Sequence, residues 1–181
     1  IGIYQKGGII RNSGKLEFNT GTKNTGVYTT NGTATNESTG TIEVGSSSFG
    51  MVTTAGYLNN DGTIKITASK GTGMYSDNLN VDAIKNNNLI TAAGVTDAVG
   101  IYGKTVTNTS NGTITMGDNS IGIYSNEGNV TNDGNITVGN NKSIGILAVG
   151  NNQNVALNGN IVIGDDSFGL VNKGSGNSII S

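Results

Sequence analysis

A short motif of Gly, an aliphatic residue and usually Tyr recurs along the whole chain at a nearly constant interval. Its glycines are Gly2, Gly26, Gly50, Gly73, Gly100, Gly122, Gly145 and Gly169. The intervals between them run from 22 to 27 residues. A fixed period in this range is the sequence signature of a stacked repeat, because each unit is too small to bury a core alone. The sequence therefore predicts seven full units and the start of an eighth.

A second motif follows about a dozen residues after the first and alternates apolar and polar residues. It reads Gly40-Thr-Ile42-Glu-Val44 in one unit and Gly62-Thr-Ile64-Lys-Ile66 in the next. Alternation at period two, with Ile, Val and Thr, is typical of a strand with one buried face. Between the two motifs lies a weaker third strand, as in Ala34-Thr-Asn36. Each unit is thus expected to hold three short strands, with turns rich in Gly, Asn and Asp.

Stacking the units in register would bury what each unit alone leaves exposed. Every strand would pair in parallel with its equivalent one coil away, and inward side chains would form continuous apolar columns. The expected columns are Ile3, Val27, Met51, Met74, Ile101, Ile123, Ile146 and Leu170; Leu16, Ile42, Ile64, Ile90, Ile114, Ile136 and Ile161; and Phe18, Val44, Ile66, Ala92, Met116, Val138 and Ile163. None of these positions is polar, which indicates an all-β parallel β-helix, or solenoid, over residues 1–181.

Asn recurs just before the second motif in successive units. The recurring residues are Asn12, Asn36, Asn60, Asn86, Asn108 and Asn132. Stacked Asn side chains can hydrogen-bond amide to amide along the coil axis. We expect a structural ladder here.

Composition excludes several kinds of chemistry. The chain has 30 Gly and no Cys, His, Pro or Trp, so it offers no zinc site of the usual kind, no thiol nucleophile and no imidazole base. Only 12% of residues are charged, and the net charge is −2, so the composition gives no sign of a basic surface that would bind nucleic acid. The apolar runs are far shorter than the roughly 20 residues of a membrane span. We expect no cofactor, no metal and no insertion of this segment into a membrane.

The repeated Gly-Ile-Tyr motif and the Asn-x-Gly-x-Ile-x-Val motif resemble the passenger domain of large type V autotransporter adhesins of fusobacterial type. The resemblance covers essentially all 181 residues. It implies a right-handed β-helix displayed on the bacterial surface outside the outer membrane. The anchoring barrel would lie in a part of the protein that this chain does not contain. The chain would then be a single β-helix segment excised from a longer passenger.

Five of the six tyrosines occupy one column directly after the inward aliphatic residue. They are Tyr4, Tyr28, Tyr75, Tyr102 and Tyr124, and Val52, Leu147 and Val171 interrupt the column. The alternation predicts that this strip faces outward, where its rings could stack on a ligand such as a sugar. The simpler and favoured interpretation is that the rings stack on one another and support the coil.

Carboxylates are the other candidate site. Glu17 and Glu43 are equivalent residues of adjacent coils, and paired acids are common in β-helix enzymes that act on polysaccharides. The short turns predict a flat and solvated surface there, so we expect no catalytic residue. Asp61, Asp118, Asp133, Asp165 and Asp166 all fall in turns, where Asp forms local hydrogen bonds.

The longest unit, from Gly73 to Gly100, departs most from the pattern, in segments 76–80 and 92–98. Extra residues must leave the coil as loops, which is where solenoids often carry function. These additions are short, so they could bulge the rod without forming a site.

These features favour a rod that presents adhesive regions to a host-cell receptor, of protein or glycan, or to partner bacteria. Two alternatives stay open. One is a polysaccharide-active enzyme, and the other is a rod that associates with its own copies.

Overall fold

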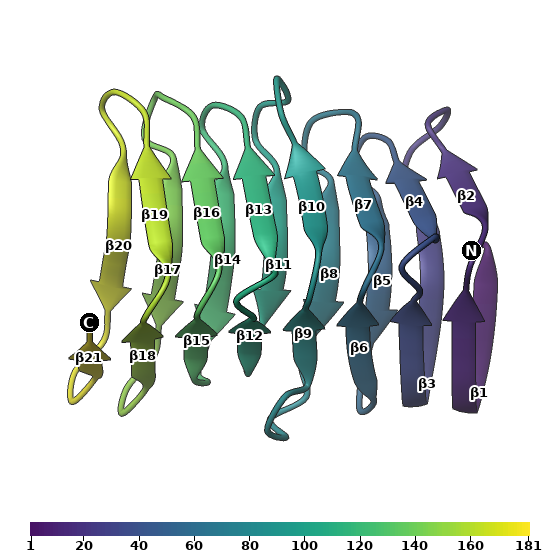
Figure 1. Ribbon diagram of the computed structural model, residues 1–181, viewed down its shortest axis with the longest axis horizontal. Coiled ribbons are helices and arrows are strands. Elements are labelled where there is room, and N and C mark those ends of the chain that lie inside the picture. Colours follow the sequence, from purple (N-terminus) through teal and green to yellow (C-terminus); the bar gives the residue numbers. More distant parts are fainter.

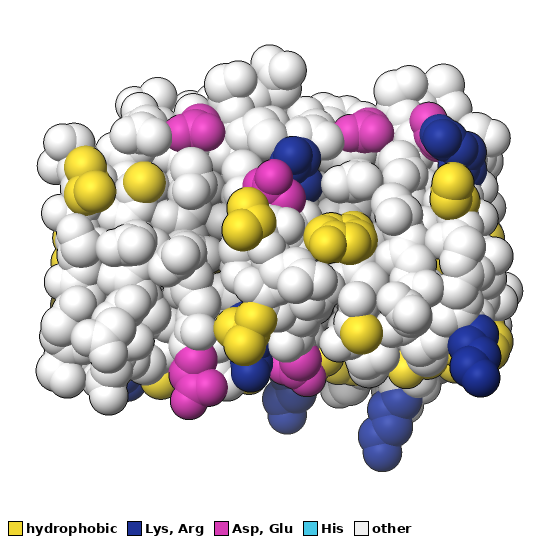
Figure 2. Space-filling model, turned by 90° about the horizontal axis from the view of Figure 1, so that it is seen from below, with side chains coloured by type: hydrophobic (Ala, Val, Ile, Leu, Met, Phe, Trp, Pro, Cys, Tyr) yellow, Lys and Arg dark blue, Asp and Glu magenta, His cyan; other side chains and the backbone are white.

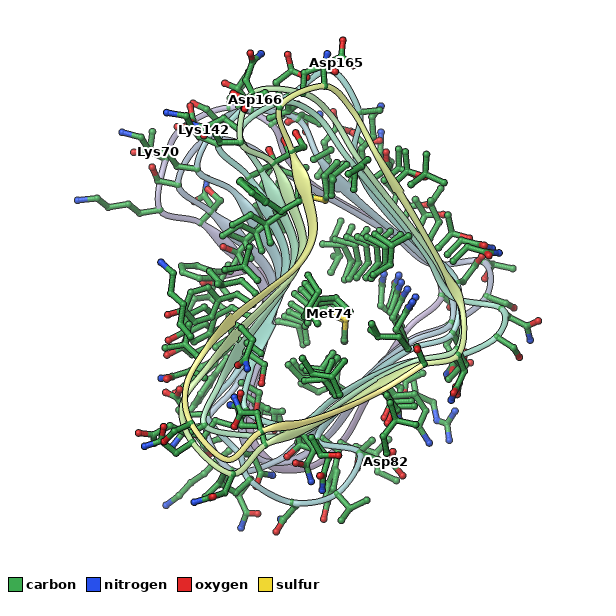
Figure 3. All side chains as sticks on the ribbon, turned by 90° about the vertical axis from the view of Figure 1, so that its left-hand side faces the viewer. Lys70, Met74, Asp82, Lys142, Asp165 and Asp166 are labelled. Atoms are coloured by element: carbon green, nitrogen blue, oxygen red, sulfur yellow. The ribbon has the colours of Figure 1, made fainter.

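The computed structural model describes residues 1–181 and shows a parallel β-solenoid with three faces (Figure 1). All 21 regular elements are strands; the chain forms no helix, and so none of a length and apolarity that would cross a bilayer. Seen from the C-terminal end, the chain approaches the viewer counter-clockwise, so the coil is right-handed (Figures 1 and 3). The predicted fold class is confirmed.

The first face carries the Gly-aliphatic-Tyr motif. Its strands are the N-terminal parts of β1 (Ile3–Asn12) and β3 (Thr25–Asn36), followed by β5 (Phe49–Thr53), β8 (Thr72–Ser76), β11 (Val99–Gly103), β14 (Ile121–Asn126), β17 (Ile144–Val149) and β20 (Phe168–Lys173).

The second face corresponds to the weaker strand of the repeat. It comprises the C-terminal parts of β1 and β3, then β6 (Tyr57–Asn60), β9 (Ile84–Asn86), β12 (Val106–Asn108), β15 (Val130–Asn132), β18 (Asn154–Leu157) and β21 (Ser178–Ile180).

The third face is a separate seven-stranded sheet formed by the second motif. It comprises β2 (Lys15–Phe18), β4 (Thr41–Val44), β7 (Thr63–Ile66), β10 (Leu89–Ala92), β13 (Thr113–Met116), β16 (Asn135–Val138) and β19 (Asn160–Ile163).

Register places equivalent residues of successive coils side by side. Ile90 pairs with Ile114 on the third face, and Ile101 pairs with Ile123 on the first. In the first two coils the chain departs from the expected three short strands, because β1 and β3 continue around the corner from the first face to the second. The two strands pair with each other through that corner, with Gly8 opposite Gly32.

The core lies between the three faces and runs along the whole rod (Figure 3). The predicted columns point inward, and a fourth column, contributed by the second face, completes the core. It consists of Ile10, Ala34, Leu58, Ile84, Val106, Val130 and Val155. At the two ends the columns lose their cover: Leu16 and Phe18 are only partly buried, and Ile163 is 45% exposed. Each coil therefore needs a neighbour on both sides to bury its apolar residues.

The glycine of the first motif has a packing reason. A Cβ on Gly100 would lie 2.6 Å from the carbonyl oxygen of Gly122 and 2.9 Å from Cγ2 of Ile114. A Cβ would meet the equivalent glycine carbonyl and isoleucine of its own surroundings, at closely similar distances, at Gly26, Gly50, Gly73, Gly122 and Gly145. The glycine is required because an Ile of the third face packs directly on the backbone of the first.

Candidate functional site

The tyrosine column lies on the outer surface of the first face, as the alternation predicts. Strand register sets Tyr4 beside Tyr28 and Tyr75 beside Tyr102, and Tyr102 beside Tyr124. Tyr4 is 56% exposed, whereas the other four are partly buried. The column is therefore a surface that a partner can reach.

Neighbouring rings stack face to face. The ring centroids are 5.5 Å apart for Tyr4 and Tyr28, 5.0 Å for Tyr75 and Tyr102, and 4.7 Å for Tyr102 and Tyr124. The interplanar angles in the last two pairs are only 12° and 10°. Such offset stacking adds stability beyond the buried area, which agrees with the favoured structural interpretation of the column.

The stacked tyrosines hold their protons tightly. Burial, followed by the hydrogen bond that the Tyr75 hydroxyl donates to Asp77 Oδ2 at 2.8 Å, raises the pKa of Tyr75 to about 12. Burial, together with the neighbouring Tyr124, also raises the pKa of Tyr102. Both side chains are neutral at ordinary pH and present uncharged aromatic surfaces.

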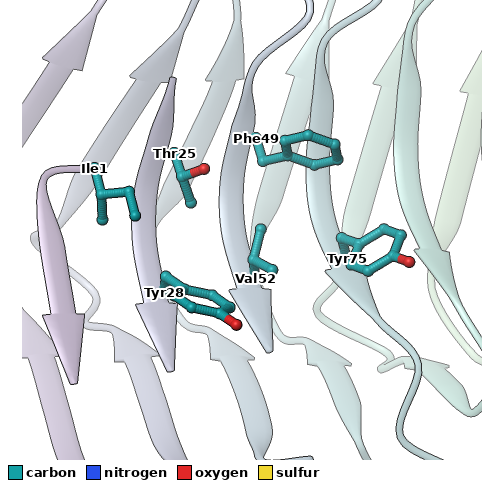
Figure 4. A pocket seen from close by; sticks show the side chains of 6 residues that line it. All are labelled: Ile1, Thr25, Tyr28, Phe49, Val52 and Tyr75. Carbon is teal, nitrogen blue, oxygen red and sulfur yellow. The ribbon is translucent and has the colours of Figure 1, made fainter. Parts of the chain in front are cut away.

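One interruption of the column leaves a hollow on the surface. Val52 stands between Tyr28 and Tyr75 in the register, and a hollow of about 260 Å³ opens over it (Figure 4). Its lining residues are Ile1, Thr25, Tyr28, Phe49, Val52 and Tyr75. It is the one hollow of this kind in the structure. Of the residues proposed from sequence, it brings together Tyr28 and Tyr75, while Tyr4, Tyr102 and Tyr124 lie along the same strip outside it.

Phe49 and Thr25 had no role in the sequence-based proposal, although the repeat contains the signal. The coil with Val52 has Phe49 where its neighbours have Thr25 and Thr72, so an aromatic residue appears three positions before the interruption. The last coil repeats this arrangement with Phe168 and Val171. The Phe49 ring meets the Tyr75 ring edge to face, at 5.7 Å and 76°. Comparing the outward positions of neighbouring coils would have revealed this wall of the hollow.

The paired carboxylates lie on the outer surface of the third face and are neutralised there. Lys15 Nζ is 2.7 Å from Glu17 and 3.5 Å from Glu43, and Asn19 donates hydrogen bonds to both carboxylates. The hydrogen bond from Asn19 and the charge of Lys15 lower the pKa of Glu43. A carboxylate held in its ionised form is a poor proton donor, so this geometry lends no support to general acid catalysis.

The insertion in the longest unit forms an ordered loop between β8 and β9. Asn78 is buried at its base, where its side chain donates to the carbonyl of Gly56 at 2.8 Å and accepts from the Asn80 amide at 3.0 Å. The loop exposes Leu79 and Val81, which are 61% and 79% exposed. Seen from below, the rod presents scattered apolar and charged side chains among polar ones, without one dominant patch (Figure 2).

The side-chain hydrogen bonds of the acidic turn residues Asp61, Asp118 and Asp133 join adjacent coils and are not the local bonds expected within one turn. Asp118 accepts from the backbone amide of Asn140 at 2.8 Å and from the side chain of Asn141 at 3.1 Å. Asp165 and Asp166 lie at the same corner of the coil (Figure 3). No group of three or more acidic side chains lies close enough to hold a metal ion.

By its fold this protein is a parallel β-solenoid with an aromatic strip along one outer face. No protein-family model matches the chain, and no curated protein or solved structure matches it significantly.

Proposed function

We propose that this chain is a segment of a bacterial autotransporter passenger, a surface rod that holds adhesive regions away from the cell. The observation that carries the proposal is the uniform stacking of the coils. Each coil pairs with the next in the same register on all three faces, so the rod gains length by repetition alone. The Gly-Ile-Tyr and Asn-x-Gly-x-Ile-x-Val motifs support the assignment to passengers of fusobacterial type.

The rod also supports attachment, because its outer faces are free for contact. The core residues point inward, and the tyrosine strip stays at the surface of the first face. Partners would be a host-cell receptor or the surface of another bacterium.

A surface-display experiment tests the passenger role. The chain is placed between a secretion signal and an outer-membrane barrel in a laboratory Gram-negative host, and protease is added to intact cells. We expect the chain to be removed by the protease, as a displayed passenger would be. A well-expressed chain that stays protected inside the cell envelope would contradict the proposal.

Attachment is tested with the purified chain, after circular dichroism has established that it is β-structured. We expect saturable binding to epithelial cells or to partner bacteria. The matched variant replaces Tyr4, Tyr28, Tyr102 and Tyr124 with Ser. Loss of binding in a folded variant would assign attachment to the tyrosine strip, whereas unchanged binding would place it elsewhere on the rod.

A further inference from the structure

The hollow over Val52 is a missing place in a stack of aromatic rings. The column supplies one ring per coil at Tyr4 and Tyr28, omits it at Val52, and resumes at Tyr75, Tyr102 and Tyr124. Leu147 and Val171 also interrupt the column, but they are neighbours at its C-terminal end, and no hollow lies over them. Among the interruptions, only Val52 has a tyrosine on both sides. The vacancy at Val52 is therefore specific to one coil.

The size of the vacancy matches one flat ring. Tyr28 and Tyr75 belong to strands two places apart, which is about 9.6 Å at roughly 4.8 Å per strand. A ring placed midway would lie about 4.8 Å from each, within the range of roughly 4.5 to 7 Å that aromatic pairs prefer. The tyrosine pairs of this rod already stack at 4.7 to 5.5 Å.

Phe49 shapes the hollow without filling it. Its ring leans toward Tyr75 and meets it edge to face, so it forms a wall beside the place that Val52 leaves open (Figure 4). Thr25 occupies the equivalent position in the preceding coil, where its small side chain leaves the other side clear. The hollow thus has the rings of Tyr28 and Tyr75 on two sides, the Phe49 ring as a wall and the aliphatic side chain of Val52 as its floor.

The lining selects the chemistry of the ligand. No charged side chain lines the hollow, and its hydroxyl groups are those of Thr25, Tyr28 and Tyr75. The Tyr75 hydroxyl already donates to Asp77. A sugar ring carries hydroxyl groups around its edge, and the mostly apolar lining offers few polar groups to pair with them. An aromatic side chain buries only apolar atoms on its faces.

We propose that the hollow over Val52 binds an aromatic side chain of a protein partner, stacked between Tyr28 and Tyr75. This inference specifies the kind of partner that the adhesive rod would bind, and its biological role rests on the proposed function. The binding itself depends only on the folded stack of the first four coils, which supply the lining residues.

The absence of Trp from the chain makes the site directly measurable. The probe is the blocked peptide Ac-Gly-Trp-Gly-amide, whose indole fluorescence shifts to shorter wavelength when it leaves water. We expect a saturable blue shift on titration with the purified chain. Ac-Gly-Phe-Gly-amide should displace the probe, whereas Ac-Gly-Leu-Gly-amide and methyl β-galactoside should compete at least about tenfold less well, because they lack a flat aromatic face.

The decisive variant fills the hollow with a side chain of the protein itself. Val52→Tyr introduces the residue that most coils carry at this position, so the variant should fold as the parent chain does. Its new ring should occupy the place of the indole and lower the affinity for the probe peptide at least about tenfold. Leu147→Tyr is the matched control, since it adds a Tyr to the same column directly beside Tyr124, four coils from Val52 and away from the hollow. It should bind the probe like the parent chain.

Each outcome decides the proposal. Loss of binding in Val52→Tyr, with binding kept in Leu147→Tyr, supports it. No saturable shift with the folded parent, equal binding by Val52→Tyr, or equal competition by the Leu peptide or the galactoside would overturn it. If the single blocked amino acid Ac-Trp-amide binds as well as the Trp peptide, the site would be assigned to small aromatic molecules, and the proposal of a protein partner would be overturned. Because the assay uses neither cells nor secretion, its failure is distinct from failure of the surface-display test.

Discussion

The side chain of Asn36 donates a hydrogen bond to Oδ1 of Asn60 across 2.9 Å, and both residues are completely buried. The same bond repeats from Asn12 to Asn132, with distances of 2.8 to 2.9 Å at every step. Because each amide donates in the same direction along the rod, the ladder satisfies buried polar groups without water. It ends at Asn132, which faces Leu157 in the next coil and donates to the carbonyl of Gly134.

Breaking this ladder with a charge should be costly. In Asn60→Asp the carboxylate cannot donate to Asn86 Oδ1, and an unpaired charge is buried, so we expect a loss of about 3 to 5 kcal/mol in the free energy of unfolding, or a failure to fold. Urea denaturation followed by circular dichroism measures the change. Asn59→Asp is the control: Asn59 is only partly buried and lies beside Lys85, so this change should be nearly neutral. Equal effects at both positions would refute the ladder's role.

The marker glycine should not tolerate even one methyl group. Gly100→Ala places a Cβ against the backbone of Gly122 and against Ile114, so we expect a loss of about 1 to 3 kcal/mol in thermal unfolding experiments. Gly14→Ala is the comparison, since nothing lies within 4 Å of a Cβ there and its backbone is not left-handed. That change should be neutral or slightly stabilising. A silent Gly100→Ala would show that the two faces are free to separate.

Inward and outward positions of one strand should respond oppositely to the same substitution. Ile114 is completely buried, so Ile114→Asp should cost several kcal/mol or prevent folding, whereas Thr115→Asp on the outer surface should change stability by less than about 0.5 kcal/mol. Expression level and urea midpoint distinguish the two variants. If both were tolerated alike, the assignment of the two sides of this strand would be wrong.

The tyrosine strip should give the rod an alkaline limit. The pKa of Tyr75 is raised to about 12 in the folded chain from the ordinary value of 10.0, so folding favours its neutral form. Its contribution to stability is complete below pH 10.0 and is lost as the pH rises toward about 12. Ultraviolet absorbance of tyrosinate, recorded during an alkaline titration together with circular dichroism, follows both events.

Asp77→Asn separates the two causes of this shift. Burial is the larger cause and stays in the variant, while the charge of Asp77 is lost, so the pKa of Tyr75 should fall but remain above 10.0. A return to the ordinary value would show that the carboxylate, and not burial, governs this tyrosine.

The architecture could be predicted from sequence because it depends on local pattern repeated at a fixed interval. Ile42, Ile64 and Ile90 recur at the same place in successive units, and the period-two alternation around them fixes which side is buried. Repetition then amplifies each weak local signal, since every coil meets a copy of itself. The Asn ladder and the outward tyrosine column could be predicted for the same reason.

Some turn conformations were beyond such reasoning. Gly, Asn and Asp are the residues that tolerate left-handed backbone, yet Lys70 and Ser47 also adopt it, with φ of 61° and 51°. The amide of Lys70 donates to the carbonyl of Asp97 one coil away, and that of Ser47 donates to Ser69. Contacts between coils therefore hold these residues in a conformation that their side chains do not favour.

The sequence by itself determined the coiled fold, the number of residues in each coil and the inner and outer sides of its strands, because each of these follows from residue type at a repeating position. Only the tertiary structure decided where the repeat fails to fill its own surface. The hollow depends on Val52 meeting Tyr28 on one side and Tyr75 on the other, and the neutralised acids depend on Lys15 reaching Glu17 and Glu43 together. Such features arise where residues of neighbouring coils depart from the repeat. What these residues form together depends on distances between coils, which the sequence of a single unit does not contain.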